Sequence, residues 1–416
     1  MRTTTVKGTN DYLPAEVELR DFMQSTILHV YQSNGFERIM TPAIEDIDNL
    51  DKSDGGDNLN LIFKVLKRGE KLSKAIHESK FDDLADMGLR YDLTLPLSRY
   101  FANNKSQLTM PFKCIQIDKV YRAERPQKGR LRELVQCDID IIGSESNNCE
   151  IELIDITAKA LLAIGLTDFK VRINDRQVLK SILLSMHFQE SQLDSVCISF
   201  DKLGKIGITG VKRELLEKGL EQENVENLVS FLGRLPLKIS DIKALLPEQE
   251  AAENLESIIY GVERLASGRY NIEFDLSLVR GQGYYTGTVF EVESIDFKGS
   301  IAGGGRYDNL IGKFVNETVP AVGFSIGFER IFCILSERSF SIPNQKKKIA
   351  ILYDDFFEAN NIAESFRSDF SVTLFEKPKK IGKYLSRLQK NGYYGYFICG
   401  YAQDITLFVT PEVSDK

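Results

Sequence analysis

The chain has few of the residues that metal sites, disulfide frameworks and membrane spans require. Only 3 of its 416 residues are histidine, and its 6 cysteines are scattered without a CxxC pair. We therefore expect buried thiols, no disulfide framework and no protein-built metal site. The longest apolar run, residues 160–166, is far shorter than the roughly 20 residues that cross a bilayer, so no membrane association is expected. Residues 1–12 are polar and lack the apolar core of a signal peptide, so we expect a cytoplasmic protein.

Charge is spread unevenly along the chain. The net charge is −7, yet residues 344–416 carry 11 basic against 9 acidic side chains. The acidic excess therefore lies in the first 343 residues. A locally basic surface can bind phosphate although the whole protein is acidic.

The usual phosphate-binding loops are missing. No GxxxxGK[ST] pattern occurs, and residues 281–287 differ from a dinucleotide fingerprint because the last interval is too long and a strand follows. The sequence offers instead three arginines beside strand-like or glycine-bearing segments, Arg122, Arg280 and Arg330. Guanidinium groups stay charged and grip phosphate oxygens at two points, so three that converge would suit a triphosphate. Each alone would more often be a surface ion-pair partner, and the sequence does not show whether they converge.

Periodicity predicts an α+β protein with a second, smaller domain. A helix is expected from Pro14 to near Gly35, and strands with a hairpin loop at 125–130 are expected over 112–142. The expected domains are an α+β domain made of residues 1–176 and 269–340, a helical insertion at 177–268 and a small α/β domain at 345–416.

Several segments, in order, resemble one family. Residues 121–126 (YRAERP), 129–133 and 136–140 resemble the second motif of class II aminoacyl-tRNA synthetases in its histidyl form. The other matching segments are 7–14 (opening), 35–42 (first motif), 278–287 and 300–308 (histidine-specific motifs) and 321–330 (third motif). The chain is thus similar to the histidyl-tRNA synthetase family along almost its whole length. The resemblance implies a class II antiparallel-sheet catalytic domain, a helical insertion and a small α/β anticodon-binding domain.

The resemblance also implies a reaction: histidine is activated with ATP to histidyl-adenylate and transferred to the 3′ end of tRNA(His). By resemblance, Arg122 holds the α-phosphate and the histidine carboxylate, Arg330 lies along the far phosphates and Arg280 supplies a cation at the reacting phosphate. Such a reaction builds negative charge on phosphate oxygens, which fixed cations stabilise. Glu124 is expected to meet the adenine amino group, and Mg²⁺ to bridge the remaining phosphate oxygens.

A histidine ligand presents an ammonium and an imidazole, so its pocket should contain carboxylates and ring partners. The resemblance assigns the ammonium to Asp92, Leu93 and Thr94, with Gln136 assisting. It assigns the imidazole to Asp140, Tyr284 and Tyr285. It also leads us to expect that the 303–305 glycines form a turn through which backbone approaches the substrate. The chain's own histidines, His29, His77 and His187, receive no role.

The expected partners are tRNA and a second copy of the chain. Gln127 lies in the loop that reaches the tRNA acceptor end in this family. Lys379 and Lys383 belong to a basic stretch, 377–390, in the expected anticodon-binding domain, although a solvated helix face would explain that composition equally well. Residues 35–42 resemble the segment through which class II subunits pair, so we expect a homodimer.

Two other functions stay open. A non-catalytic paralogue with the same fold binds histidine and regulates ATP phosphoribosyltransferase, but such a regulator has no need for Arg122, Glu124, Arg330 and a basic tail. A paralogue that modifies an acceptor other than tRNA is the second alternative.

Overall fold

The computed structural model describes residues 1–51, 60–200, 202–246, 248–279 and 284–408. Arg280 therefore lies outside the described residues. The chain forms two compact units, Met1–Phe340 and Ser341–Lys416. Each unit has its own sheet and its own core.

A large mixed sheet organises the first unit, with the strand order β1-β5-β6-β11-β10-β9-β7-β8. All neighbours pair antiparallel except β1 with β5 and β7 with β8. The strands are β1 (Glu37–Arg38), β5 (Phe112–Tyr121), β6 (Glu133–Ile142), β7 (Phe169–Asp175), β8 (Asn271–Phe274), β9 (Thr288–Ser294), β10 (Phe297–Arg306) and β11 (Ala321–Gly327). The α+β class and the mainly antiparallel large sheet expected from the sequence are confirmed.

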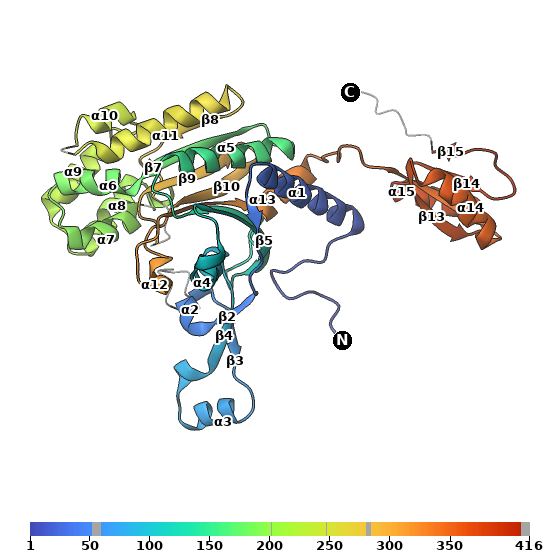
Figure 1. The fold of residues 1–416 in the computed structure, drawn as a ribbon, viewed down its shortest axis with the longest axis horizontal. Coiled ribbons are helices and arrows are strands. Elements are labelled where there is room, and N and C mark those ends of the chain that lie inside the picture. The colour runs from blue at the N-terminus through green and yellow to red at the C-terminus, as the bar shows by residue number, and fades with distance from the viewer. Residues whose placement is uncertain (52–59, 201, 247, 280–283, 409–416) are drawn as a thin grey trace. The chain divides into compact units, whose positions relative to one another are not determined.

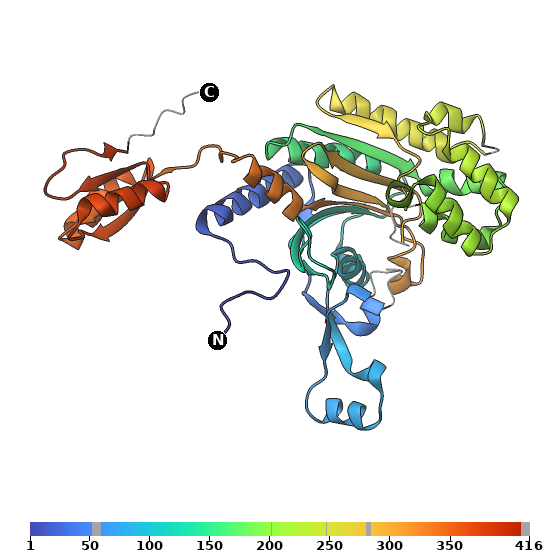
Figure 2. The ribbon, with the colours of Figure 1, turned by 180° about the vertical axis from the view of Figure 1, so that it is seen from behind.

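Helices cover one face of this sheet (Figures 1 and 2). They are α1 (Pro14–Ser33), α5 (Asn148–Ala163), α11 (Glu250–Ala266) and α13 (Phe328–Glu337). In α1 the proline occupies the first turn, where its missing N–H costs nothing, and Leu19, Met23 and Ile27 recur at helical spacing on the buried side. Burial of that stripe fixes α1 against the sheet.

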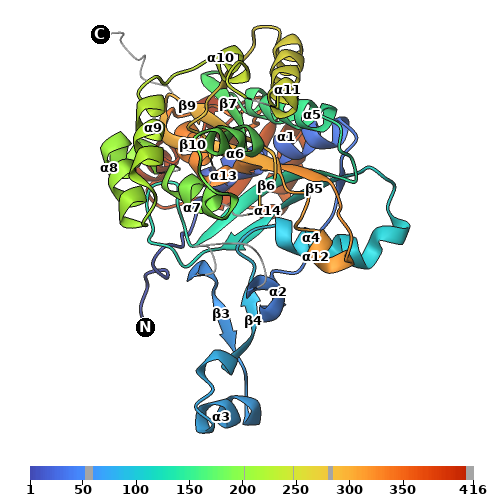
Figure 3. The same cartoon turned by 90° about the vertical axis from the view of Figure 1, so that its left-hand side faces the viewer.

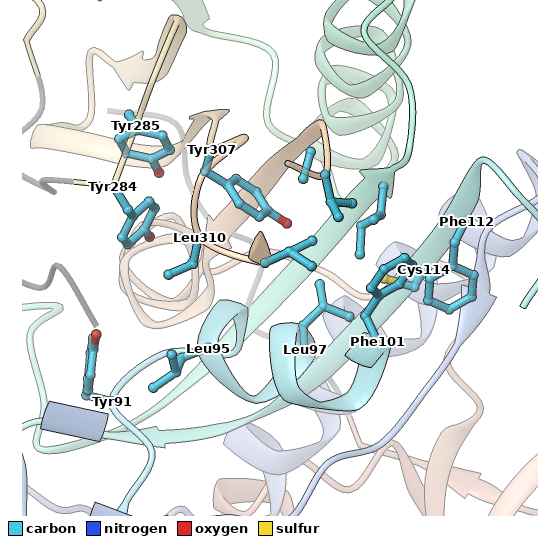
Figure 4. Packing of buried hydrophobic residues seen from close by; sticks show 14 of the residues in the cluster. Tyr91, Leu95, Leu97, Phe101, Phe112, Cys114, Tyr284, Tyr285, Tyr307 and Leu310 are labelled. Carbon is cyan, nitrogen blue, oxygen red and sulfur yellow. The ribbon is translucent and has the colours of Figure 1, made fainter. Parts of the chain in front are cut away.

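The opposite face of the sheet carries α4 (Thr94–Asn104), with α2 (Ile47–Asp51) and α12 (Gly312–Val315) nearby (Figure 3). Leu95, Leu97 and Phe101 of α4 pack in one cluster with Tyr307 and Cys114 (Figure 4). This face holds most of the residues to which a ligand role was assigned.

A second sheet of three short strands projects from the first unit (Figures 1 to 3). Its order is β2-β4-β3, and the elements are β2 (Ile44–Asp46), β3 (Lys64–Leu66), α3 (Glu70–His77), a single 3₁₀ turn (Phe81–Asp83) and β4 (Ala85–Leu89). The sequence predicted one interrupted strand over 37–44. The structure divides that segment at Pro42 between β1 and β2, which belong to different sheets, because proline cannot donate to a continuing ladder.

The segment between β7 and β8 is helical. It contains α6 (Arg176–Ser185), α7 (Glu190–Phe200), α8 (Leu203–Glu217), α9 (Gln222–Leu232) and α10 (Ile239–Lys243), before α11. Asp175 accepts a hydrogen bond from the backbone N–H of Gln177 and so caps α6.

The glycines at 303–305 do not form the expected turn; they lie inside β10, between β9 and β11. A Cβ on Gly304 would lie 2.0 Å from the backbone oxygen of Gly323, and one on Gly305 would lie 2.8 Å from the ring of Tyr285. Glycine is therefore needed here because the strand is too closely packed to hold a side chain.

The second unit contains a four-stranded sheet with the order β13-β12-β14-β15. Its elements are β12 (Lys347–Tyr353), α14 (Phe356–Phe366), β13 (Phe370–Glu376), α15 (Ile381–Lys390), β14 (Gly395–Ile398) and β15 (Thr406–Leu407). β12 pairs parallel with β13 and β14, whereas β15 pairs antiparallel with β14. The alternation of strands and helices expected from the sequence is thus present.

Burial of the thiols agrees with the sequence analysis for most of them. Five of the six cysteines are buried, while Cys333 is half-buried. Within the described residues, no helix is long and apolar enough to cross a membrane.

Candidate active site

Three carboxylates converge on the α4 side of the large sheet. Asp138 and Asp140 lie two residues apart on β6, and Asp92 lies just before α4. Their residues are only 3–4% exposed. We call Asp92, Asp138 and Asp140 the acidic cluster. Asp92 and Asp140 were assigned from the sequence, whereas Asp138 was not.

Neutral donors surround the acidic cluster. The hydroxyl of Tyr307 donates to Oδ1 of Asp140 at 2.5 Å, and the backbone N–H of Leu95 donates to Oδ1 of Asp92 at 3.2 Å. Nε2 of Gln136 lies 3.5 Å from Oδ1 of Asp138. Oδ2 of Asp92 is buried and has no hydrogen-bond partner among the residues that the structure describes. A buried carboxylate oxygen without a partner is costly, so this atom is suited to accept from a ligand.

Burial shifts the ionisation of all three acids. Desolvation raises the pKa of Asp92 to about 6 and that of Asp140 to about 7. Desolvation also raises the pKa of Asp138 well above its usual value, and the charge of Asp140 raises it further. The hydrogen bond from Tyr307 acts in the opposite direction on Asp140, as does the charge of Arg122 on Asp92. Perturbed carboxyls gathered in this way are typical of ligand sites.

Three tyrosines line the neighbouring part of the core (Figure 4). Tyr284 and Tyr285 are 7% and 8% exposed, and their ring centroids lie 4.8 Å apart. The ring of Tyr307 meets that of Tyr284 edge-on at 6.1 Å. The tyrosine pair is therefore joined to the acidic cluster through Tyr307, which the sequence analysis missed.

Arg122 lies between the acids and the other arginines. Its Nε donates to the backbone oxygen of Tyr91 at 2.9 Å, and its Nη2 donates to Oε1 of Gln136 at 3.0 Å. Gln136 in turn donates to Oγ of Ser325 on β11 at 2.8 Å. The guanidinium is thus held in one orientation by neighbouring strands and loops.

Arg330 lies near two other cations. Its pKa is lowered first by burial and then by the charge of Arg130, with a further contribution from Arg122. We call Arg122, Arg130 and Arg330 the cationic cluster. The carboxylates of Glu291 and Glu124 also act on Arg330 and partly offset this repulsion. Like charges held this close indicate a site for a polyanion. Arg280, the third arginine of the sequence analysis, lies outside the described residues.

The loop between β5 and β6 packs against Arg330. A Cβ on Gly129, where φ is +67°, would lie 2.9 Å from both Cγ of Arg330 and the ring of Phe297. Backbone hydrogen bonds of 3.0 and 2.9 Å link Gln127 and Arg130 across the turn. This closure leaves the Gln127 side chain exposed and places Arg130 3.4 Å from Oε2 of Glu124.

The opening segment of the chain covers the same loop. The backbone N–H of Arg132 donates to the oxygen of Gly8 at 2.7 Å. A Cβ on Gly8 would lie 2.7 Å from Cγ of Pro126, so glycine permits this close approach.

Glu329, the neighbour of Arg330 on α13, has a structural position. It is 4% exposed, receives two hydrogen bonds from Arg20 at 2.7 and 2.9 Å, and accepts another from the backbone N–H of Val135 at 3.2 Å. These bonds tie α1, β6 and α13 together behind the cationic cluster.

The remaining assigned residues lie where their elements place them. Leu93 is fully buried, and its backbone oxygen accepts from Nε2 of Gln116 at 2.9 Å. Thr94 begins α4, and its backbone contributes to lowering the pKa of Asp92. Lys379 and Lys383 are exposed at the start of α15 in the second unit. His29, His77 and His187 are exposed.

Comparison with known proteins identifies the family. The model of the family described as "Histidyl-tRNA synthetase" matches residues 8–331. This chain belongs to the histidyl-tRNA synthetase family. The matched residues include both charged clusters, all the strands of the large sheet and the helices between β7 and β8.

Curated relatives extend the likeness into the second unit. A histidine–tRNA ligase of Leifsonia xyli is 38% identical over 94% of each chain, and one of Azobacteroides pseudotrichonymphae is 40% identical over 90% of this chain and 83% of its own. Among solved structures, the histidyl-tRNA synthetase of a Nostoc species has a TM-score of 0.78 at 29% identity and covers 95% of this chain and 91% of its own.

A Bacillus halodurans structure described as an ATP phosphoribosyltransferase regulatory subunit/histidyl-tRNA synthetase also has a TM-score of 0.78, at 21% identity, and covers 97% of this chain and 100% of its own. At that identity the likeness concerns the fold alone.

Proposed function

We propose that this member of the histidyl-tRNA synthetase family is a histidine–tRNA ligase, which joins histidine to ATP as histidyl-adenylate and transfers it to tRNA(His). The observation that carries this proposal is the position of Arg122, next to both the acidic cluster and Arg330. An amino acid and a nucleotide bound on its two sides would meet at this guanidinium.

Histidine would occupy the acidic side. Its ammonium is a suitable donor for Oδ2 of Asp92, which is buried and unpartnered. Thr94, at the start of α4, and Gln136, whose side-chain amide contacts Arg122, would also bind the ammonium group. The imidazole would lie toward Asp140 and the pair Tyr284 and Tyr285 (Figure 4).

ATP would occupy the cationic side. Arg122 would hold the α-phosphate and the histidine carboxylate together, while Arg330 would lie along the outer phosphates. Arg280 remains in this proposal as a cation for the reacting phosphate, on the sequence resemblance alone. The carboxylate of Glu124 would accept a hydrogen bond from the adenine amino group once its 3.4 Å contact with Arg130 is broken. Because the histidine carboxylate is already ionised at neutral pH, its attack on the α-phosphorus needs no protein base.

Mg²⁺ would enter with the nucleotide. In the described parts of the chain, no three His, Cys, Asp or Glu side chains are arranged so that they could hold a metal ion together, so phosphate oxygens would have to supply most ligands. Glu291 acts electrostatically on Arg330, and we propose its carboxylate as a protein ligand of Mg²⁺ beside the phosphate oxygens. The ion would supply charge neutralisation on the phosphate oxygens.

The tRNA would contact both units. The exposed Gln127, beside Arg330, is placed to meet the acceptor end. Lys379 and Lys383 would bind backbone phosphates near the anticodon, because exposed lysines on one helix start give a sequence-independent attraction.

We also propose a homodimer. β1 is the edge strand of the large sheet, and Met40, two residues later, is 74% exposed. β1 itself is short and charged, so the exposed apolar side chain of Met40 beside this edge is the feature suited to contact a symmetry mate. Light scattering at micromolar concentration should give twice the chain mass, and a monomer would refute the dimer.

Aminoacylation tests the ligase function directly. The purified chain, incubated with ATP, Mg²⁺ and tRNA(His) transcript, should attach labelled histidine to the tRNA and leave a tRNA with a different identity uncharged. Adenylate without charged tRNA would favour a different acceptor. Neither adenylate nor charged tRNA would favour the regulatory alternative.

A further inference from the structure

Neutral groups orient the guanidinium of Arg330. Its Nη1 donates to the backbone oxygen of Ser300, and its Cζ lies 5.7 Å from the centroid of the Phe297 ring. In the described parts of the chain, Glu291 and Glu124 act on Arg330 through charge and form no hydrogen bond with it. A carbonyl dipole and an aromatic face attract a guanidinium without neutralising its charge. The charge of Arg330 therefore stays available for a polyanion.

Both neutral groups come from the irregular beginning of β10. The pairing of β10 with β9 shifts register between Phe297 and Ser300, and again between Ser300 and Ala302. Gly299 has a φ of +112°, a conformation that favours glycine. Such a bulge bends a strand and changes the direction in which its groups point. We call residues 297–300 the bulged segment, which places a ring and a carbonyl beside the same guanidinium.

The loop between β5 and β6 packs against the bulged segment as well. A Cβ on Gly129 would lie 2.9 Å from Cζ of Phe297 and 2.9 Å from Cγ of Arg330. The charges of Arg130, in this loop, and of Arg122 repel Arg330. In the absence of a polyanion, this repulsion favours orientations in which Arg330 points away from the other cations. The ring and the carbonyl oppose that displacement.

We propose, on the basis of the proposed function, that Phe297 is a positioning residue of the ligase, whose ring holds the guanidinium of Arg330 ready for the phosphates of ATP. The ring acts through Arg330 and does not contact a substrate. A cation that is already oriented needs no rearrangement when negative charge builds on the phosphate oxygens. Phe297 lies outside every segment on which the family resemblance rests, so the resemblance gave it no role.

Pyrophosphate exchange with varied ATP and saturating histidine tests the proposal. Phe297→Leu keeps an apolar side chain but removes the ring face, so kcat/KM for ATP should fall about tenfold. Histidine affinity, measured by calorimetry, should not change. Phe297→Tyr keeps the ring and should retain kcat/KM for ATP to within about twofold. Ile295→Ala, in the turn between β9 and β10 and 84% exposed at that residue, is the matched control and should equal the wild type. Equal values for Phe297→Leu and the wild type would overturn the proposal.

A double-mutant cycle separates positioning from direct contact with the nucleotide. If the ring acts through Arg330, Phe297→Leu should change exchange by less than about twofold in an Arg330→Ala background. A loss in that background as large as in the wild-type background would overturn the proposal, because the ring would then contact ATP itself.

Pentafluorophenylalanine at position 297 keeps the shape of the ring and reverses the charge distribution on its face. This variant should lower kcat/KM for ATP in the same direction as Phe297→Leu, and a wild-type value would overturn the proposal. It decides the question if Phe297→Leu does not bind histidine. Absence of histidine-dependent exchange in the wild-type chain would instead overturn the proposed function, and this inference with it.

Discussion

The acidic and cationic clusters meet at Arg122, which belongs to the cationic cluster, and they differ in burial. The acids are 3–4% exposed and receive hydrogen bonds from neutral donors, whereas Arg122 and Arg330 are half-buried and Arg130 is exposed. A small amino acid can be enclosed on all sides, but a nucleotide must enter and pyrophosphate must leave. The difference in burial therefore matches the difference in the two proposed substrates.

Removal of Arg330 should have the largest effect, and only on the cationic side. Arg330→Ala removes a fixed charge from the outer phosphates, which costs about 3 kcal/mol or more in the transition state. Pyrophosphate exchange should fall at least ~100-fold, while calorimetry should show unchanged histidine binding. Arg338→Ala, at the other end of α13, is the control and should behave as the wild type. Exchange within tenfold of the wild type would contradict the assignment.

Asp140→Ala should affect the acidic side instead. A ring that loses its buried partner binds more weakly by about 1 to 3 kcal/mol, roughly 5- to 150-fold. Calorimetry should show this loss for histidine, whereas ATP affinity should stay the same. Equal histidine affinity in variant and wild type would exclude Asp140 from the pocket.

The acidic cluster should also destabilise the empty protein at high pH. The pKa of Asp140 is raised to about 7, far above its unfolded value, so the folded state binds the proton more tightly. Its contribution is favourable below the unfolded pKa of about 4 and is lost as pH rises through 7. Asp140→Asn should therefore raise the free energy of unfolding at pH 8 by on the order of 1 to 2 kcal/mol, and by less at pH 5.

Denaturant titrations at both pH values check this prediction. Asp168→Asn, which removes an exposed charge, should leave the free energy of unfolding unchanged at both pH values. If Asp140→Asn is destabilised equally at pH 5 and pH 8, Asp140 stabilises the empty protein through its hydrogen bond with Tyr307. The prediction that its ionisation lowers the free energy of unfolding would then be wrong.

The smallest effect is expected far from both clusters. Lys379→Glu combined with Lys383→Glu should weaken tRNA charging by about tenfold and reduce the slope of log affinity against log salt by roughly two, because about one counterion is released per phosphate contact. Pyrophosphate exchange should not change. The double reversal Lys71→Glu and Lys74→Glu on α3, also exposed, is the control. Equal losses in both double variants would show a general charge effect only.

The sequence predicted the elements better than their contacts. Pro14 and the periodic apolar residues after it identified α1, because local preferences determine where a helix begins. The glycines at 303–305 were wrongly placed in a turn, because the close packing of β10 against β11 involves residues distant in sequence.

The site was only partly foreseeable for the same reason. Motif resemblance pointed to Arg122 and Arg330, but they come close only because the fold brings the segment after β5 near α13. Tyr307 and Asp138 were missed although both lie in or beside matched motifs. The alternation of Gln136, Asp138 and Asp140 on one strand face was the available signal, since residues two apart point the same way.

The most direct test of the account is histidine-dependent exchange of pyrophosphate into ATP by the unmodified chain. Two adjoining clusters of opposite charge, joined at Arg122, should support exchange with histidine at a rate far above that with any other common amino acid. Absence of exchange, with histidine still bound, would mean that the cationic cluster does not bind ATP productively and would contradict the central claim.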